Sequence, residues 1–218
     1  MSRWRVAGSL SDRLVQAAVG PTLRGRRVVL RPLRPSDFLA WQEVRRRNGE
    51  WLTRWEPRRP PDQPDVAEHR RSFEARCDQR DRDRAMGTSC GLGLFIDDRL
   101  AGEVNVNNIV RGAAQYADIG YWIDRHFAGR GYMPESVVAL LRHVFEDLGL
   151  HRVQIAIVPR NSASRRVVEK LGIRDEGVAL RFLEINGVWE DHVRFAITVE
   201  EWQQRRGDLL DLWVLPEP

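Results

Sequence analysis

The stretch from residue 115 to residue 149 constrains the fold more than any other part of the chain. In it a β-like segment, DIGYWI (118–123), runs into a glycine-rich turn, AGRGYM (128–133), and a helical pattern follows at once. This order places free backbone N–H groups and the positive end of a helix dipole around one point. The sequence therefore predicts a site for a phosphorylated ligand. The alternative is a tight turn that binds nothing.

The residues of the turn suit such a site. Gly129 and Gly131 allow positive φ and let the backbone approach a ligand with no Cβ in between. Arg130, between them, offers a charge to a phosphate oxygen. Pro134 fits the first turn of the following helix, and Gly149 fits the cap at its other end.

Composition excludes several classes of protein. The chain has 218 residues, of which 42% are hydrophobic and 30% charged, as expected for one globular domain with short terminal extensions. No apolar run approaches the ~20 residues of a membrane span, and we expect no membrane partner. The first 21 residues are broken by Asp12 and Arg13 and read as a short amphipathic helix or arm rather than a signal peptide.

Charge and cysteine content narrow the class further. The net charge of +4 allows a nucleic-acid partner, but acidic residues interleave with the arginines of the most basic stretch, 70–84. We therefore predict a solvated helix face there and no direct nucleic-acid binding. The two cysteines fit a reducing compartment, and we expect the cytoplasm. No C-x-x-C pattern occurs and the histidines are scattered, so we expect no metal site.

Segments of strand and helix alternate along the rest of the chain. Strands are predicted at 26–32, 90–96, 100–110, 116–123, 151–158, 178–185 and 188–198, and helices at 35–48, 65–84, 134–148, 162–172 and 199–206. Asp97-Asp98 and Asn186-Gly187 mark the turns of two hairpins. The mixed order of hairpins and strand–helix units predicts an α+β fold.

Two motifs resemble the GNAT superfamily of acetyl-CoA-dependent N-acetyltransferases. Gly131 falls on the central glycine of the family's pyrophosphate loop, [QR]-x-x-G-x-[GA], while Ala128 and Met133 depart from its first and last positions. Downstream, NSASRRVVEKLGI (161–173) resembles the family's N-x-x-S-x-R motif and the L-G-[FI] that follows it. The segments 101–112 and 186–198 resemble the Rim-type enzymes, of which the RimJ-like ones acetylate the N-terminal alanine of a ribosomal protein.

The resemblance implies a fold and a co-substrate. It implies one central mixed, mostly antiparallel sheet flanked by helices, with splayed parallel fourth and fifth strands and acetyl-CoA in the gap. The acetyltransferase domain would span 24–206, between an N-terminal extension (1–23) and a C-terminal tail (207–218). The residues implied in CoA binding are Tyr121, Trp122, Ile123, Ala128, Gly129, Arg130, Gly131, Tyr132, Met133, Asn161, Ser164 and Arg166.

The implied reaction moves an acetyl group from a thioester to an amine, which needs a neutral amine, an oxyanion donor and a proton for the thiolate. We interpret Asp118 as the candidate base, or else as a strand-surface aspartate paired with a neighbour. Ser164 is the candidate acid near the sulfur, or else a packing residue. Glu103 and Glu184 are second choices for the base. An α-amine, with a pKa near ~8 against ~10.4 for lysine, can be served by a weak base acting through water.

The acceptor side is assigned by resemblance and residue type. Trp51, Trp55 and Trp189 would line a peptide groove, unless they are core or rim residues, and Asn105 and Asn108 would bond the acceptor backbone. The lead hypothesis is an acetyltransferase for the N-terminal α-amine of a protein, of alanine or serine type, with a ribosomal protein as substrate. The alternatives are a GNAT enzyme for aminoglycosides or polyamines and a non-catalytic CoA-binding module. The oligomeric state stays open.

Overall fold

The computed structural model describes residues 20–60 and 64–214, so residues 1–19 of the predicted N-terminal extension and 215–218 of the predicted tail fall outside it. The described residues form one sheet with the order β1-β2-β3-β4-β5-β6-β8-β7. The strands are β1 (Leu23–Arg24), β2 (Val28–Arg31), β3 (Cys90–Ile96), β4 (Arg99–Val110), β5 (Tyr116–Ile123), β6 (Arg152–Ile157), β7 (Arg174–Ile185) and β8 (Val188–Thr198). Neighbouring strands are antiparallel except β5 and β6.

The parallel pair β5–β6 opens after a short contact. Its paired positions begin at Tyr116↔Arg152 and end at Asp118↔Gln154. β5 then runs on to Ile123 and β6 to Ile157, each without the other as a partner. The fourth and fifth predicted strands correspond to β5 and β6, so the predicted gap between them is confirmed. One edge of β5 is therefore free to bond an extended ligand in the manner of an added strand.

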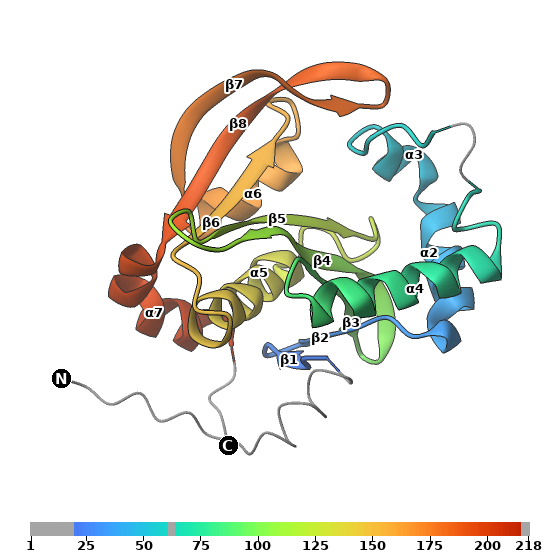
Figure 1. The fold of residues 1–218 in the computed structure, drawn as a ribbon, viewed down its shortest axis with the longest axis horizontal. Coiled ribbons are helices and arrows are strands. Elements are labelled where there is room, and N and C mark those ends of the chain that lie inside the picture. Colours follow the sequence, from blue (N-terminus) through green and yellow to red (C-terminus); the bar gives the residue numbers. More distant parts are fainter. Residues whose placement is uncertain (1–19, 61–63, 215–218) are drawn as a thin grey trace.

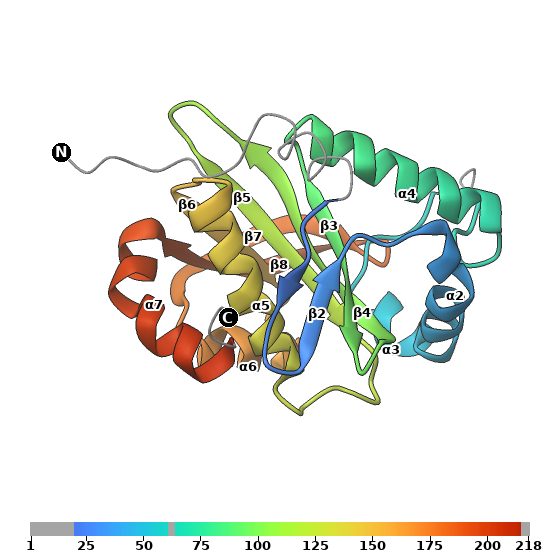
Figure 2. The same ribbon diagram turned by 90° about the horizontal axis from the view of Figure 1, so that it is seen from below.

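Helices cover both faces of the sheet. They are α2 (Phe38–Arg47), α3 (Gly49–Thr53), α4 (Arg70–Ala85), α5 (Tyr132–Arg142), α6 (Ser162–Lys170) and α7 (Val199–Trp213); a 3-10 turn (Pro35–Asp37) precedes α2, and a π-helical turn (His143–Asp147) continues α5. The main core packs the sheet against α5, α6 and α7. A smaller core packs it against α2 and α4. Figures 1 and 2 show α2, α3 and α4 gathered at one side and α7 at the other.

Most predicted elements are confirmed, with shifted ends. β5 and β8 have the predicted bounds, and both hairpin turns lie where expected. α7 runs past the predicted end at Arg206 as far as Trp213, because Leu209 and Val214 are buried in the main core. The prediction of a solvated face for 70–84 is wrong for Arg76 and Arg80, which turn inward to Glu103. The division into extension, domain and tail stays a prediction.

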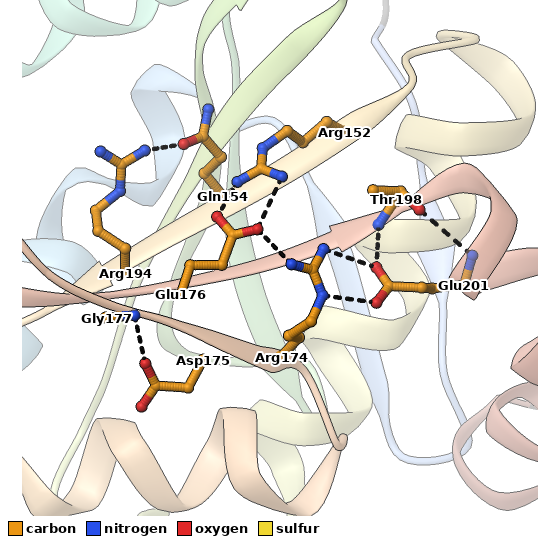
Figure 3. Close-up of polar contacts among 9 residues, drawn as sticks. All are labelled: Arg152, Gln154, Arg174, Asp175, Glu176, Gly177, Arg194, Thr198 and Glu201. Atoms are coloured by element: carbon orange, nitrogen blue, oxygen red, sulfur yellow. Dashed lines mark hydrogen bonds and ion pairs between the residues drawn. The ribbon is translucent and has the colours of Figure 1, made fainter.

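The β7–β8 hairpin arches over the gap between β5 and β6 toward α3 (Figure 1). At its tip Asn186 and Gly187 take φ of 50° and 86°, and the Asn186 amide donates to the Glu56 carbonyl at 2.9 Å. Figure 3 shows the polar contacts at its root. There Arg174 pairs with Glu176 and with Glu201 of the α7 capping box. No helix of the described ranges has the length and apolar character that a membrane crossing requires.

Candidate active site

The glycine turn forms an open cradle at the start of α5. Gly129 and Gly131 have φ of 79° and 87°, a region that disfavours a side chain. A Cβ at Gly129 would meet nothing within 4 Å, so the turn faces open space there. Among the described residues the amides of Gly129, Arg130 and Gly131 have no backbone acceptor, and the first-turn amides of Tyr132 and Met133 have no acceptor within their helix. The predicted donors for a pyrophosphate are therefore available.

Arg27 holds this turn in place, which the sequence did not indicate. Its guanidinium donates to the Arg130 carbonyl at 3.2 Å and lies 4.5 Å from the centre of the Tyr132 ring. It also pairs at 2.9 Å with Glu135, which is buried in the first turn of α5 and accepts from the Val28 amide. The Met133 side chain is buried in the core. Only the backbone of residue 133 can serve a ligand, so the departure from glycine or alanine there does not block the cradle.

Side chains of β5 alternate between the two faces of the sheet. Ile119, Tyr121 and Ile123 pack in the main core with α5 and α6. Trp122 packs in the smaller core with α2 and α4, so Asp118 shares that face by the period of two. The candidate base therefore lies on the face of the sheet opposite to the face that packs against α6, the helix of the candidate acid.

Ser164, the predicted acid, lies in the first turn of α6 and is hydrogen-bonded to Asn161 and Tyr121. Asn161 caps α6, and its side chain accepts from the Ser164 amide at 3.1 Å. The Ser164 hydroxyl donates to the Tyr121 hydroxyl at 3.0 Å, and that hydroxyl donates to the Ser164 carbonyl at 3.2 Å. Burial raises the pKa of Tyr121 well above its usual value, partly offset by the Ser164 hydrogen bond. A protonated phenol thus stands behind the serine. Arg166 lies exposed on the same helix.

The predicted base has a single polar partner among the described residues. Asp118 is half-buried at the last position of β5 that pairs with β6. The Asn108 side-chain amide donates to its carboxylate at 2.9 Å. Asn108 has a φ of 50° at an irregularity of β4, which turns its side chain toward β5. Asn108 is therefore brought to Asp118, whereas Asn105 lines a separate cavity on the same face.

Glu103 cannot serve as the base. It is fully buried and takes a hydrogen bond of 2.6 Å from the Trp41 indole and ion pairs of 2.7 Å from Arg76 and Arg80. Burial alone would raise the pKa of Glu103, but the two arginines and the indole lower it to about 2. This carboxylate stays ionised and paired, so its role is structural.

The three predicted tryptophans occupy different places. The Trp51 indole donates to the Ile123 carbonyl at 3.2 Å, which ties α3 to the end of β5. Trp55 lies under the Arg160 guanidinium, 5.6 Å from its ring centre, and Arg160 pairs with Glu190 of β8 at 2.7 Å. The α3 segment thus bridges the ends of β5 and β8. Trp189 is 63% exposed on the hairpin and joins no cluster of site residues.

Comparisons with known proteins give the same family as the two sequence motifs. The sequence model of the acetyltransferase (GNAT) domain matches residues 27–174. YjcK of Bacillus subtilis, a probable N-acetyltransferase, is 35% identical over 80% of this chain and 96% of its own length. The ribosomal protein uS5-alanine N-acetyltransferase of Escherichia coli is 29% identical over 83% of this chain and 92% of its own.

A solved structure shares the fold closely. RimJ of Mycobacterium smegmatis, solved in complex with CoA-disulfide, superposes with a TM-score of 0.79 at 31% identity, over 88% of this chain and 92% of that one. The domain match covers more than half of the sequence, and the gap, the glycine cradle and the capped α6 are those that the motifs predicted. The chain therefore belongs to the GNAT family of N-acetyltransferases and uses acetyl-CoA as its co-substrate.

Proposed function

We propose that this enzyme acetylates the N-terminal α-amine of a protein that begins with alanine or serine, and that a ribosomal protein is its substrate in the cytoplasm. The observation that carries the proposal is the pair of candidate catalytic groups on opposite faces of the sheet near the point where β5 and β6 separate, with a carboxylate as the candidate base. The relatives named for uS5-alanine acetylation and for RimJ support it. The free, buried Cys77 and Cys90 fit a reducing compartment.

The roles follow from the side on which each group lies. The amine approaches from the face of Asp118, which draws its proton away through water. Amides on the free edge of β5 hold the pantetheine, and the cradle at residues 128–133, with Asn161 and Arg166 of the α6 region, holds the rest of the CoA. Ser164 gives a proton to the departing thiolate, with the Tyr121 phenol behind it as the next donor.

The choice of an α-amine rests on proton energetics. At neutral pH about a tenth of α-amines are already neutral, but only about one lysine amine in a few thousand is. A carboxylate that is exposed enough to reach water is a weak base. Such a base suffices for an α-amine but serves a lysine amine poorly. Asp118 is such a group, while Glu103 is locked in its ion pairs.

The acceptor side would use the residues that line the mouth of the site. Trp51 and Trp55 form the α3 bridge, Trp189 lies exposed beyond it, and Asn105 and Asn108 face the acceptor side of the sheet. A folded substrate protein would rest on this rim while its N-terminal residues reach the gap.

The test is acetyl transfer to defined amines. The purified enzyme is given acetyl-CoA with peptides that begin with alanine or serine, the same peptides with a blocked α-amine and an internal lysine, a polyamine and an aminoglycoside. We expect turnover of the free α-amine peptides only. Turnover of the polyamine or aminoglycoside in their place would make this a small-molecule enzyme. CoA binding without transfer to any amine would make it a binding module.

A further inference from the structure

A cavity of about 560 Å³ lies on the acceptor face of the sheet. Its floor comes from β4 and β5, and its walls come from α2, α3 and the segment before α4. The side chains that matter below are Asn105 and Trp122 in the floor, Trp41 and Arg45 of α2, and Arg76 of α4. Its volume falls within the range of sites that enclose a small molecule or a few peptide residues.

The cavity is close to the predicted reaction centre. Asn105 is the direct cross-strand neighbour of Gly120, two residues after Asp118 on the free-edged strand. A Cβ at Gly120 would meet only the Asn107 amide, at 3.5 Å. Gly120 therefore places no β5 side chain between Asp118 and Asn105 on this face of the sheet.

Most charged groups around the cavity already have partners. Arg45 makes a two-pronged pair with Glu56 at 2.6 and 2.7 Å. Arg46 pairs with Glu68 at 3.0 Å, and Asp65 accepts from the Ala67 amide at 2.8 Å. None of these groups calls for a ligand.

Two polar atoms of the lining side chains differ from the rest. The Oδ1 of Asn105 and the Nη1 of Arg76 are both shielded from solvent, and neither has a hydrogen-bond partner within the described ranges. The first is an acceptor and the second a donor. A buried polar group without a partner costs free energy, and a ligand that pairs with it recovers that cost.

One unpaired acceptor and one unpaired donor are the complement of a peptide group. We propose that Asn105 and Arg76 recognise the first peptide group of the acceptor: its N–H donates to Asn105 Oδ1, and its C=O accepts from Arg76 Nη1. A protonated polyamine has donors but no acceptor, so it would leave the Nη1 of Arg76 without a partner. The inference rests on the proposed function and narrows it, because recognition lies in the backbone that follows the amine.

The test removes the N–H of that peptide group and nothing else. An alanine-initiated peptide is compared with its depsipeptide, in which an ester oxygen replaces the first peptide nitrogen. For the wild type we expect the ester to lower kcat/KM on the order of 10-fold, the effect of one lost hydrogen bond to a buried partner. In Asn105→Ala the two peptides should react at the same rate. Asn105→Asp keeps an acceptor, so it should retain the preference for the amide.

Arginine variants test the other half of the contact. Arg76→Lys keeps a cation beside Glu103 but loses Nη1, and it should raise KM for the peptide. Arg80→Lys is the matched control, because Arg80 pairs with the same carboxylate at the same 2.7 Å but does not line the cavity. CoA affinity and the unfolding midpoint of each variant show that it is folded.

The outcomes separate the inference from the function on which it rests. If the wild type acetylates the peptide but treats amide and ester alike, or if Asn105→Ala keeps the full preference, the recognition of the peptide group is refuted and the function stands. Equal KM increases in Arg76→Lys and Arg80→Lys would likewise refute the role of Arg76. If the wild type acetylates no peptide at its α-amine, both fall.

Discussion

The Ser164 hydroxyl of α6 donates a 3.0 Å hydrogen bond to the Tyr121 hydroxyl of β5, and this contact joins α6 to the part of β5 that no longer pairs with β6. The Tyr121 hydroxyl in turn donates to the Ser164 carbonyl. Hydroxyl hydrogens rotate easily. When Ser164 turns its proton toward a thiolate in the gap, Tyr121 can redirect its own proton to the Ser164 oxygen. In the proposed reaction the two residues would therefore act as a short proton chain, with Ser164 as its last donor.

Ser164→Ala should slow the chemical step without loosening CoA. Because the departing thiolate loses its proton donor, we expect kcat to fall on the order of 100-fold. Tyr121→Phe removes only the second donor and should cost less. Single-turnover transfer to an alanine-initiated peptide measures both variants, with CoA affinity from calorimetry as the control. Unchanged kcat in Ser164→Ala would reduce Ser164 to a packing residue.

Gly131→Asp should abolish tight binding of CoA. The new Cβ would lie 3.2 Å from the Arg27 guanidinium at a φ of 87°, and the carboxylate would add a negative charge to the cradle proposed for the diphosphate. Two like charges at about 4 Å repel by several kcal/mol in a partly buried site, so a loss of about 100-fold or more in affinity is expected. Calorimetric titration with CoA measures it. Gly112→Asp introduces the same side chain at a φ of 73° in open space and should bind CoA normally.

Local sequence signals gave the strands, the cradle and the α6 cap, because each depends on residues that are neighbours in the chain. Gly129, Gly131 and Asn161 act through their own backbone or the next turn. The roles of Arg27, Arg76 and Tyr121 depend on partners far away in the sequence. Alternation along 118–123 could have placed Tyr121 beside α6, but no pattern marked which arginines of 70–84 turn inward.

Glu103→Gln tests the strongest of these distant contacts. The substitution keeps the shape of the side chain but leaves Arg76 and Arg80 as buried cations without a carboxylate. We expect the free energy of unfolding to fall by about 3 kcal/mol at neutral pH. Urea unfolding measures it, with Glu169→Gln as the control, since the exposed Arg165–Glu169 pair contributes little.

The pH dependence of the Glu103 contribution follows from its lowered pKa, about 2 against 4.5 in the unfolded chain. The stabilisation is present above about 4.5 and is lost as the pH falls toward 2. At neutral pH the wild type should therefore have a higher free energy of unfolding than Glu103→Gln. The curves of this free energy against pH should converge for the two proteins at low pH. Parallel curves would show that folding does not lower the pKa of Glu103.

His143 is the corresponding group at alkaline pH. It is buried in the π-helical turn, 2.6 Å from Asp147. Burial alone would lower the pKa of His143, but hydrogen bonds to Asp147 and Cys90 raise it to about 9 from 6.5. Its stabilisation is therefore present below about 6.5 and lost as the pH rises through about 9.

Replacing this histidine should flatten the alkaline limb of the stability curve. Asp147 is largely exposed and solvent screens the pair, so we expect the wild type to lose about 1 to 2 kcal/mol of unfolding free energy between neutral pH and pH 9. His143→Gln keeps a hydrogen-bonding side chain but carries no proton to lose, so its stability should change less over that range. His151→Gln, at an exposed pair with Glu200, should keep the wild-type slope. Urea unfolding at several pH values measures all three proteins, and equal slopes in His143→Gln and the wild type would show that His143 is neutral in the fold.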